Sequence, residues 1–520
     1  MPSSLAPHFI PFPPADSKPN SKSLPNASTH SSPPTSSKVT HKKAIPCSPP
    51  VKPSAPPWPP PKPMEPEPAA NHLRWTTSST GAVFPVPQLR IPSTPSQIYL
   101  LCKIRSSIPP PKFRQPFRDD RTSPAMLEIE TALARILDSV SPLDPIRVPL
   151  TSALHHFAAR ALHATVALPG FDNSAMDGYA VFAADTTTTS PLPIIAEQPA
   201  GTSKNLTLNS GTAIRIFTGA PMPEGADAVI MQEDVDLSPD KTHIQCREPV
   251  VSGENLRRTG TDICLGQQLL KPGDALTPTR LALLASQGLN EISVIRPPRV
   301  AIITTGDELI PAGQPLLPGQ LYNSNGILLQ SLVAQLGISA ISTHHLPDDL
   351  DQTISALREL TGTHDFLILS GGVSVGDHDH IKPALQSLGI LPNLWRVKIK
   401  PGKPLLHART ETNPCQIFGL PGNPVSSYVT YQIFVRPALL KSMGSFQFEL
   451  PTVPATLNQA VDNPGDRPHY LRGTLQQNTF IPTGVQQSHA LFGLSQANAM
   501  LRLEANQSLA AGTNVILLVP

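Results

Sequence analysis

The sequence predicts a multidomain chain in which one α/β domain with a parallel sheet is joined to β-rich domains. Three observations carry this prediction. From Arg299 onward, apolar runs alternate with helical patterns, which is typical of a βαβαβ unit. Residues 180–251 and 446–520 instead show short apolar runs separated by Gly, Pro and Asn, which predicts an inserted β-rich lobe and a C-terminal β-barrel or sandwich. Residues 1–125 hold 30 of the 63 prolines and a single glycine, which predicts a disordered extension.

The extension is basic and rich in Pro and Ser. It carries 15 Lys and Arg against 5 Asp and Glu, whereas the remaining residues carry 25 against 33. Proline runs such as 56–61 prevent helices and central strands and favour polyproline II. Four interpretations stay open: a flexible tail, a docking ligand, an organelle transit peptide, or an artefact of start-site choice, because Met126 directly precedes an amphipathic pattern.

Composition also indicates in which cellular compartment the protein works. The sequence has no run of 18 apolar residues and no secretory signal pattern. Its five cysteines are scattered without C-x-x-C spacing, which argues against a disulfide framework and a zinc finger and fits a reducing compartment. We therefore expect a cytoplasmic protein that uses neither a membrane nor a nucleic acid as partner.

The first half of the globular part mixes helical patterns with a turn-rich stretch. Apolar spacing predicts helices over 126–140, 152–163 and 277–287, and strands over 213–217 and 228–231. A turn-rich stretch follows the predicted helix at 152–163, and in it Asp172 and Asp177 stand five residues apart. These aspartates suit metal binding or substrate orientation, and they equally suit ordinary turn chemistry.

The second half has the order of a parallel sheet with helices on both faces. The pattern predicts strands over 300–304, 338–341, 366–369 and 416–418, with helices over 325–336, 348–360 and 428–440. Short strands return after residue 446, for example at 473–475 and 515–518.

Three loops of this half have the chemistry of an anion site. Gly371 and Gly372 follow one strand, and a Gly-Leu-Pro-Gly-Asn-Pro loop follows another, so backbone N–H groups can approach a phosphate closely. Lys400 and Lys403 lie in Lys-Pro-Gly-Lys-Pro, which cannot be helical. The sequence therefore predicts one crevice at the carboxyl edge of the sheet. Asp307 and Glu308, at another strand end, predict a divalent cation that bridges to phosphate.

Six motifs together resemble the MoeA-type molybdopterin molybdenumtransferase family, which is similar to the E domain of gephyrin. The resemblance covers 126–520, and residues 1–125 have no counterpart in it. The motifs, in the family's order, are Pro-Gly-Phe-Asp-Asn-Ser-Ala-Met-Asp-Gly-Tyr-Ala (169–180), Thr-Gly-Ala-Pro (218–221), Thr-Gly-Asp-Glu-Leu (305–309), Ser-Gly-Gly-Val-Ser (370–374), Lys-Pro-Gly-Lys-Pro (400–404) and Pro-Gly-Asn-Pro-Val-Ser (421–426).

The resemblance implies an elongated homodimer and a four-domain plan. It implies a helical linking domain at 126–169 and 256–297, the β-rich lobe at 170–255, a molybdopterin-binding α/β domain at 298–444 and the β-barrel at 445–520. The implied reaction inserts molybdate into adenylylated molybdopterin and releases AMP and molybdenum cofactor. A separate molybdopterin adenylyltransferase is the expected partner.

The resemblance also implies roles for individual residues. Molybdate would be held by Lys400, Lys403, Arg472, Ser426 and Ser488. Mg²⁺ on the pyrophosphate would be held by Asp307 and Glu308 with Asp377 or Asp379. We assign catalysis to Asp172, Glu308, Asp379 and the two lysines. Further substrate contacts are expected from Gly371, Gly372, Ser374, Gly422 and Asn423, and from Asp172, Asp177, Thr218 and Asp262 of the other subunit.

Several alternatives stay open. His378 and His380 flank Asp379, a spacing that suits zinc or another transition metal as well as an exposed surface. The α/β domain also resembles molybdopterin adenylyltransferases and CinA-like nucleotide enzymes, although these lack the lobe with 172–179. A non-catalytic scaffold of gephyrin type, with 1–125 as a docking arm, is the third possibility. The preference between molybdate and tungstate is left open.

Overall fold

The structure, a computed structural model, describes residues 126–373 and 379–520. The expected disordered extension lies outside the described residues, as do Ser374, Asp377 and His378.

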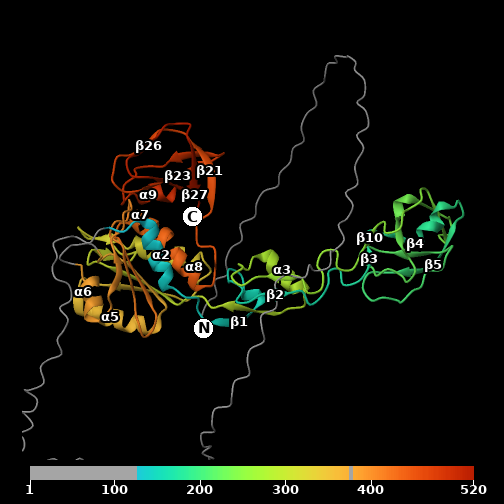
Figure 1. Cartoon of the computed structure of the whole chain (residues 1–520), viewed down its shortest axis with the longest axis horizontal. Helices are drawn as coiled ribbons and strands as arrows, with labels where there is room; N and C mark the ends of the chain where they lie inside the picture. Colours follow the sequence, from blue (N-terminus) through green and yellow to red (C-terminus); the bar gives the residue numbers. More distant parts are fainter. Residues whose placement is uncertain (1–125, 374–378) are drawn as a thin grey trace, which may run out of the picture. The chain divides into compact units, whose positions relative to one another are not determined.

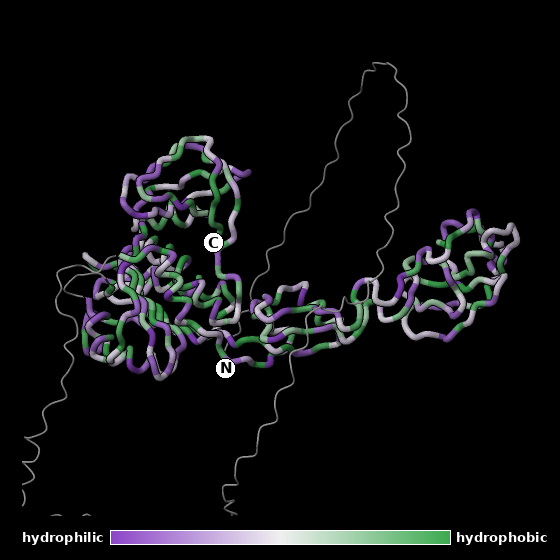
Figure 2. The backbone as a smooth tube through the Cα atoms, in the orientation of Figure 1, coloured by the Kyte–Doolittle hydropathy of each residue, from purple (hydrophilic) through white to green (hydrophobic). Residues whose placement is uncertain are grey.

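A six-stranded sheet forms the centre of the second half of the chain. Its strand order is β16-β13-β17-β20-β19-β18. The first four strands are parallel, as predicted, while β19 and β18 add an antiparallel pair at one edge. In Figure 2 the buried strands of this sheet are mainly hydrophobic. The strands are β13 (Val300–Thr305), β16 (Ile341–Leu346), β17 (Phe366–Ser370), β18 (Pro392–Trp395), β19 (Leu406–Arg409) and β20 (Gln416–Leu420).

Helices cover both faces of this sheet, as the βαβ pattern predicts (Figure 1). Because side chains alternate along a strand, Ile302 and Ile368 pack into one core and Ile303 and Leu367 into the other. α5 and α6 cover the second face, and the remaining helices, including α2, cover the first. The helices are α2 (Ile129–Ser139), α4 (Ser324–Ala334), α5 (Leu350–Thr363), α6 (Ile381–Ser387), α7 (Pro424–Thr430) and α8 (Arg436–Ser442).

Two predicted elements of this domain differ in the structure. The strand predicted at 338–341 is wrong in position, because β16 begins only at Ile341. β16 is an edge strand with half-exposed polar residues, so its sequence lacks the apolar run by which a central strand is recognised. The single helix predicted at 428–440 is interrupted by a π-helical turn, η4 (Tyr431–Val435), just before Pro437. Proline has no amide hydrogen for the helical ladder, which accounts for the change of pitch.

The region before this domain contains more strand than predicted. The helix predicted at 152–163 is wrong: a 3₁₀ turn at Leu150–Ser152 is followed by irregular chain and by β2 (Leu162–His163). The backbone N–H of Ala158 donates to the Asp274 carbonyl at 2.9 Å, and that of Ala159 donates to the Ser293 carbonyl at 3.0 Å. These long-range bonds replace the local bonds that a helix would make. The neighbouring elements are β1 (Pro145–Pro149), β11 (Gln268–Leu270), β12 (Glu291–Ile295) and α3 (Pro278–Ser286), the last as predicted.

The inserted lobe is β-rich, as predicted. It has a six-stranded sheet with strand order β7-β4-β6-β5-β9-β8. Its strands are β4 (Gly178–Val181), β5 (Leu192–Gln198), β6 (Ala213–Ile216), β7 (Ala228–Met231), β8 (Val235–Leu237) and β9 (His243–Cys246), and two shorter strands, β3 (Asn173–Ser174) and β10 (Leu256–Arg257), pair beside it.

The C-terminal part is a closed five-stranded barrel, which confirms the prediction. Leu457, Phe480, Leu501 and Leu517 belong to its core. Among the described residues, no helix is both long and apolar enough to cross a membrane. The barrel strands are β21 (Thr452–Leu457), β23 (His469–Gln476), β24 (Thr479–Pro482), β25 (Ala499–Leu503) and β27 (Asn514–Leu518).

Candidate functional site

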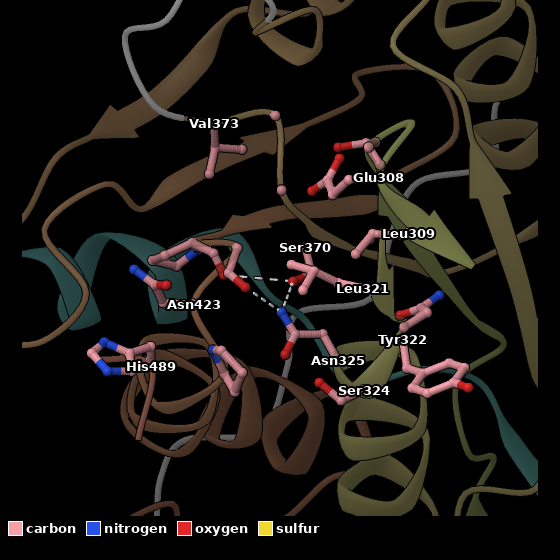
Figure 3. Close-up of a pocket in the computed structure, with 18 of the residues that line it drawn as sticks. Glu308, Leu309, Leu321, Tyr322, Ser324, Asn325, Ser370, Val373, Asn423 and His489 are labelled. Carbon is pink, nitrogen blue, oxygen red and sulfur yellow. Dashed lines mark hydrogen bonds between the residues drawn. The ribbon is translucent and has the colours of Figure 1, made fainter. Parts of the chain in front are cut away.

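A cavity of about 740 Å³ lies at the carboxyl ends of β13, β17 and β20. The loops after these strands, the start of α4 and the segment that leads into α9 (Leu491–Ser495) line it (Figure 3). This confirms that the strand-end loops meet at one crevice. Of the Lys-Pro-Gly-Lys-Pro loop, only Pro404 lines the cavity. Other lining residues include Glu308, Asn323, Asn325, Asp348, Ser370, Gly371, Gly372, Gly422, Asn423 and His489.

The two glycines after β17 are required by the close packing of this loop. Gly371 has φ +98° and Gly372 has φ +63°. A Cβ atom on Gly371 would lie 2.7 Å from Thr305 Oγ1 and 2.9 Å from its carbonyl oxygen. The cavity wall therefore has no room for a side chain here, and it presents backbone to a ligand.

The carboxylates at the cavity differ from those predicted. Glu308 lines it, but Asp307 instead accepts a hydrogen bond of 3.1 Å from the backbone N–H of Asp348. Asp348 itself lines the cavity and was missed by the sequence analysis, because the strand that precedes it, β16, was predicted to end at residue 341 instead of 346.

Asp379 is partly buried, and neither of its carboxylate oxygens has a hydrogen-bond partner among the described residues. Burial raises the pKa of Asp379 to about 6, although His380 and Lys382 act in the opposite direction. Within 126–373 and 379–520, no group of three His, Cys, Asp or Glu is arranged to hold a metal ion. Because Asp377 and His378 lie outside these ranges, the predicted Mg²⁺ ligands and the zinc alternative both stay predictions.

The lysine loop is fixed between the barrel and α7. The Lys400 N–H donates to the Pro468 carbonyl, and the Tyr470 N–H donates to the Lys400 carbonyl, both at 2.8 Å. Gly402 has φ +114°, and a Cβ atom there would lie 2.5 Å from Thr430 Cγ2 of α7. Lys400 is thereby held beside the first residue of β23, while Lys403 is exposed.

Two buried basic side chains stand at the start of β23. Arg472 is 0% exposed, and among the described residues its side chain makes one hydrogen bond, which Nη2 donates to the Val485 carbonyl at 2.8 Å. Its Nε and Nη1, and both ring nitrogens of His469, have no hydrogen-bond partner among the described residues. Burial, with the positive charges of Lys400, Arg472 and Arg467, lowers the pKa of His469 to about 4. Arg467 pairs with Asp466 at 3.6 Å, whereas no ion pair among the described residues involves Lys400, His469 or Arg472. The cluster is therefore only partly neutralised by its surroundings.

The two predicted serines are connected through the backbone at the start of α7. The Val425 N–H donates to the Ser488 carbonyl at 3.1 Å, and Ser426, the next residue, is buried. The five residues predicted for molybdate therefore come from adjoining segments of the barrel, α7 and the lysine loop. Sequence reasoning missed His469 and Arg467, because only the three-dimensional pairing with Lys400 brings them to this cluster.

The residues that we expect from the other subunit lie outside the cavity wall. Asp172 accepts bonds from Arg258 Nη1 at 2.8 Å and from the Thr259 N–H at 2.7 Å. Burial raises the pKa of Asp172, but these bonds outweigh it and hold the pKa below its ordinary value. Asp177 accepts from the Thr218 N–H at 2.8 Å, which lowers its pKa as well. Asp262, which follows Thr259 by three residues, is exposed. None of these predicted residues lines the cavity.

Comparisons with known proteins cover most of the described part of the chain. Three family models match: the MoeA N-terminal region (domain I and II) at 127–288, the probable molybdopterin binding domain at 301–441 and the MoeA C-terminal region (domain IV) at 454–519.

Similar proteins agree with these matches. The chain is 38% identical over 384 residues to molybdopterin molybdenumtransferase 2 of Mycobacterium tuberculosis, which covers 71% of this chain and 94% of the relative. It is 36% identical over 398 residues to the molybdopterin molybdenumtransferase of Haemophilus influenzae, covering 75% and 98%. A crystal structure of a molybdopterin biosynthesis MoeA protein from Pyrococcus horikoshii aligns with a TM-score of 0.66 and 28% identity, covering 76% of this chain and all of that one. The chain therefore belongs to the MoeA-type molybdopterin molybdenumtransferase family.

Proposed function

We propose that this chain is a transferase of molybdenum cofactor biosynthesis that inserts molybdate into adenylylated molybdopterin and releases AMP. Two features support the proposal: a cavity large enough for a pterin nucleotide and a cationic cluster in which two nitrogens of Arg472 have no hydrogen-bond partner among the described residues. Cytoplasmic localisation is part of the same proposal.

The observation that carries the proposal is the buried guanidinium of Arg472. Nη2 bonds to the Val485 carbonyl, but Nε and Nη1 have no hydrogen-bond partner among the described residues, and a buried charge that is only partly satisfied is costly. A ligand with free acceptors would relieve this cost. Molybdate offers four oxygens and two negative charges, and charge-assisted hydrogen bonds to such oxygens are the strong ones. Lys400 and Lys403 add positive charge, and the hydroxyls of Ser426 and Ser488 add donors.

The cavity suits the pterin nucleotide. Gly371 and Gly372 present backbone to which phosphate oxygens can bind, and Gly422 and Asn423, from the loop after β20, line the same cavity. Ser374, which is also predicted to contact the substrate, lies outside the described residues.

The residues present also fit Mg²⁺. This ion is usually held by one or two carboxylates together with substrate phosphates, and Glu308 and Asp348 provide two carboxylates in the cavity wall. Asp379, whose oxygens lack partners, is a further candidate, as are Asp307 and Asp377. When bound, Mg²⁺ neutralises charge on the pyrophosphate and on the departing AMP.

We further propose that the protein acts as a homodimer and receives its substrate from a molybdopterin adenylyltransferase. In this arrangement the other subunit supplies Asp172, Asp177, Thr218 and Asp262. The hydrogen bonds that fix Asp172 and Asp177 support a preformed group of this kind.

The test is a reaction with purified protein, adenylylated molybdopterin and molybdate. The proposal predicts release of AMP that depends on molybdate, together with cofactor that reconstitutes an apo-molybdoenzyme. Absence of AMP release from a competent substrate would contradict it. Adenylylation of molybdopterin from ATP by this chain alone would instead identify an adenylyltransferase.

A further inference from the structure

The imidazole of His489 stands in the cavity wall without a partner. His489 lines the cavity and is exposed, and its side chain makes no hydrogen bond or ion pair with another described residue. Among the lining residues it is the one histidine. Its ring nitrogens are therefore accessible to a ligand, and an imidazole in either charge state has at least one N–H group to donate.

The segment that leads to His489 begins at the cationic cluster. The Val485 carbonyl accepts a hydrogen bond of 2.8 Å from Arg472 Nη2. The side chain of Gln486 makes two hydrogen bonds with the Arg472 backbone, accepting from its N–H at 3.0 Å and donating to its carbonyl at 2.8 Å. Because only three residues separate Val485 from His489, their Cα atoms can be no more than about 14 Å apart.

The end of the same segment adjoins the serines predicted for molybdate. Ser488 directly precedes His489, and its carbonyl accepts a hydrogen bond of 3.1 Å from the Val425 N–H, beside Ser426. None of the five residues predicted for molybdate lines the cavity, whereas His489 does. His489 is therefore the residue through which the segment that holds these predicted donors reaches the cavity wall.

We infer that the imidazole of His489 donates a hydrogen bond to molybdate and holds this anion on the side that faces the cavity. The inference rests on the proposed function and adds one residue to its oxyanion site. Since the reaction joins molybdate to molybdopterin, the anion needs a contact on the side from which molybdopterin approaches. Arg472 is buried in the barrel and cannot line that side, whereas His489 is exposed there.

The phosphates of the nucleotide are the other oxyanions of the reaction, and the structure offers them a different place. Gly371 packs against Thr305, three residues before Glu308, so the glycine loop and this carboxylate stand in one part of the wall. Backbone N–H groups and a carboxylate for Mg²⁺ suit a pyrophosphate. In Figure 3, His489 lies on the same side of the pocket as Asn423 and opposite Glu308. The imidazole is thus placed for molybdate and not for the phosphates.

The experiment measures the affinities of the full-length protein for molybdate and for AMP by calorimetry, with melting temperatures alongside. His489→Ala should weaken molybdate binding about tenfold or more, because it removes one hydrogen bond to a charged group, and should change AMP affinity less than about twofold. Gln487→Ala is the matched control, since Gln487 is exposed on the same segment but does not line the cavity; it should change both affinities less than about twofold. The amide nitrogen of His489→Gln replaces Nε2 and that of His489→Asn replaces Nδ1, so one of these variants should bind molybdate more tightly than His489→Ala.

Wild-type molybdate affinity in His489→Ala would overturn the inference and leave the proposed function standing. A loss of AMP affinity without a loss of molybdate affinity would overturn it too, because the imidazole would then contact a phosphate. Equal losses in His489→Ala and Gln487→Ala would show that the segment only needs its shape, and no recovery in either amide variant would show that the contact is not a hydrogen bond. Wild-type protein that binds no molybdate would contradict the proposed function itself, and the inference with it.

Discussion

Replacing Arg472 by methionine should weaken molybdate binding without lowering the stability of the protein. Methionine keeps much of the buried volume and removes the charge and the donors. Two nitrogens of the Arg472 side chain have no partner among the described residues, and the side chain is fully buried. Each charge-assisted hydrogen bond contributes about 1.5–3 kcal/mol. Loss of two such bonds should weaken molybdate binding at least about a hundredfold.

Stability should respond in the opposite direction. A buried guanidinium without a carboxylate is a cost to the free protein, and burial lowers the pKa of Arg472 for the same reason. Arg472→Met should therefore leave the melting temperature unchanged or raise it by a few degrees at most. Arg502→Met is the control, because Arg502 pairs with Glu130 at 2.5 Å and with Glu504 at 2.7 Å and its loss should lower stability without affecting molybdate.

The assay measures molybdate affinity by calorimetry and by AMP release at limiting and saturating molybdate, with thermal unfolding in parallel. Unchanged molybdate affinity together with a lowered melting temperature in Arg472→Met would refute the reasoning. That result would make Arg472 a structural residue of the barrel.

Four further predictions follow from the same geometry. Lys403→Ala should weaken oxyanion binding by roughly tenfold with almost no change in stability, because Lys403 is exposed; wild-type AMP release at limiting molybdate would remove it from the site. Gly371→Ala should abolish AMP release, since its Cβ would lie 2.9 Å from the Thr305 carbonyl oxygen; an active variant would contradict the close approach. Burial lowers the pKa of His407 to about 4, so between pH 6.5 and 4 the unfolded chain binds more protons than the folded chain, and stability should fall as the pH is lowered through this range. In His407→Leu the free energy of unfolding should fall by about 3 kcal/mol less over the same range than in wild type. An equal fall in both proteins would contradict this. Deletion of 1–125 should leave AMP release unchanged, because the family matches begin at 127, and a loss of activity would assign the extension a role.

The strand-end loops could be predicted from sequence because their signals are local. An apolar run followed by Gly371 and Gly372 marks a buried strand and its exit turn, and the structure places that turn in the cavity wall. The order of strands and helices likewise predicted the parallel centre of the sheet. The edge strand β16 was misplaced because it is only half-buried, and an edge strand shows no continuous apolar run.

Other features depend on contacts between distant segments. Residues 152–163 have helical spacing, yet Ala158 and Ala159 bond to Asp274 and Ser293, and such pairing overrides local preference. His469 joins the cationic cluster only because the lysine loop pairs with β23. The bonds from the Asn325 amide nitrogen to Ser370 and Gly422 likewise join segments that are far apart in the sequence. Domain boundaries and the roles of the predicted site residues stay predictions until they are tested by experiment.

The most direct test of the account is the stoichiometry of AMP release. Purified protein is mixed with adenylylated molybdopterin under anaerobic conditions, with and without molybdate, and AMP, free molybdopterin and molybdenum-loaded cofactor are quantified over a single turnover. The account predicts one AMP for each molybdenum inserted, little release without molybdate, and loss of this dependence in Arg472→Met. AMP release that ignores molybdate, or no release from a substrate that a related transferase converts, would contradict it.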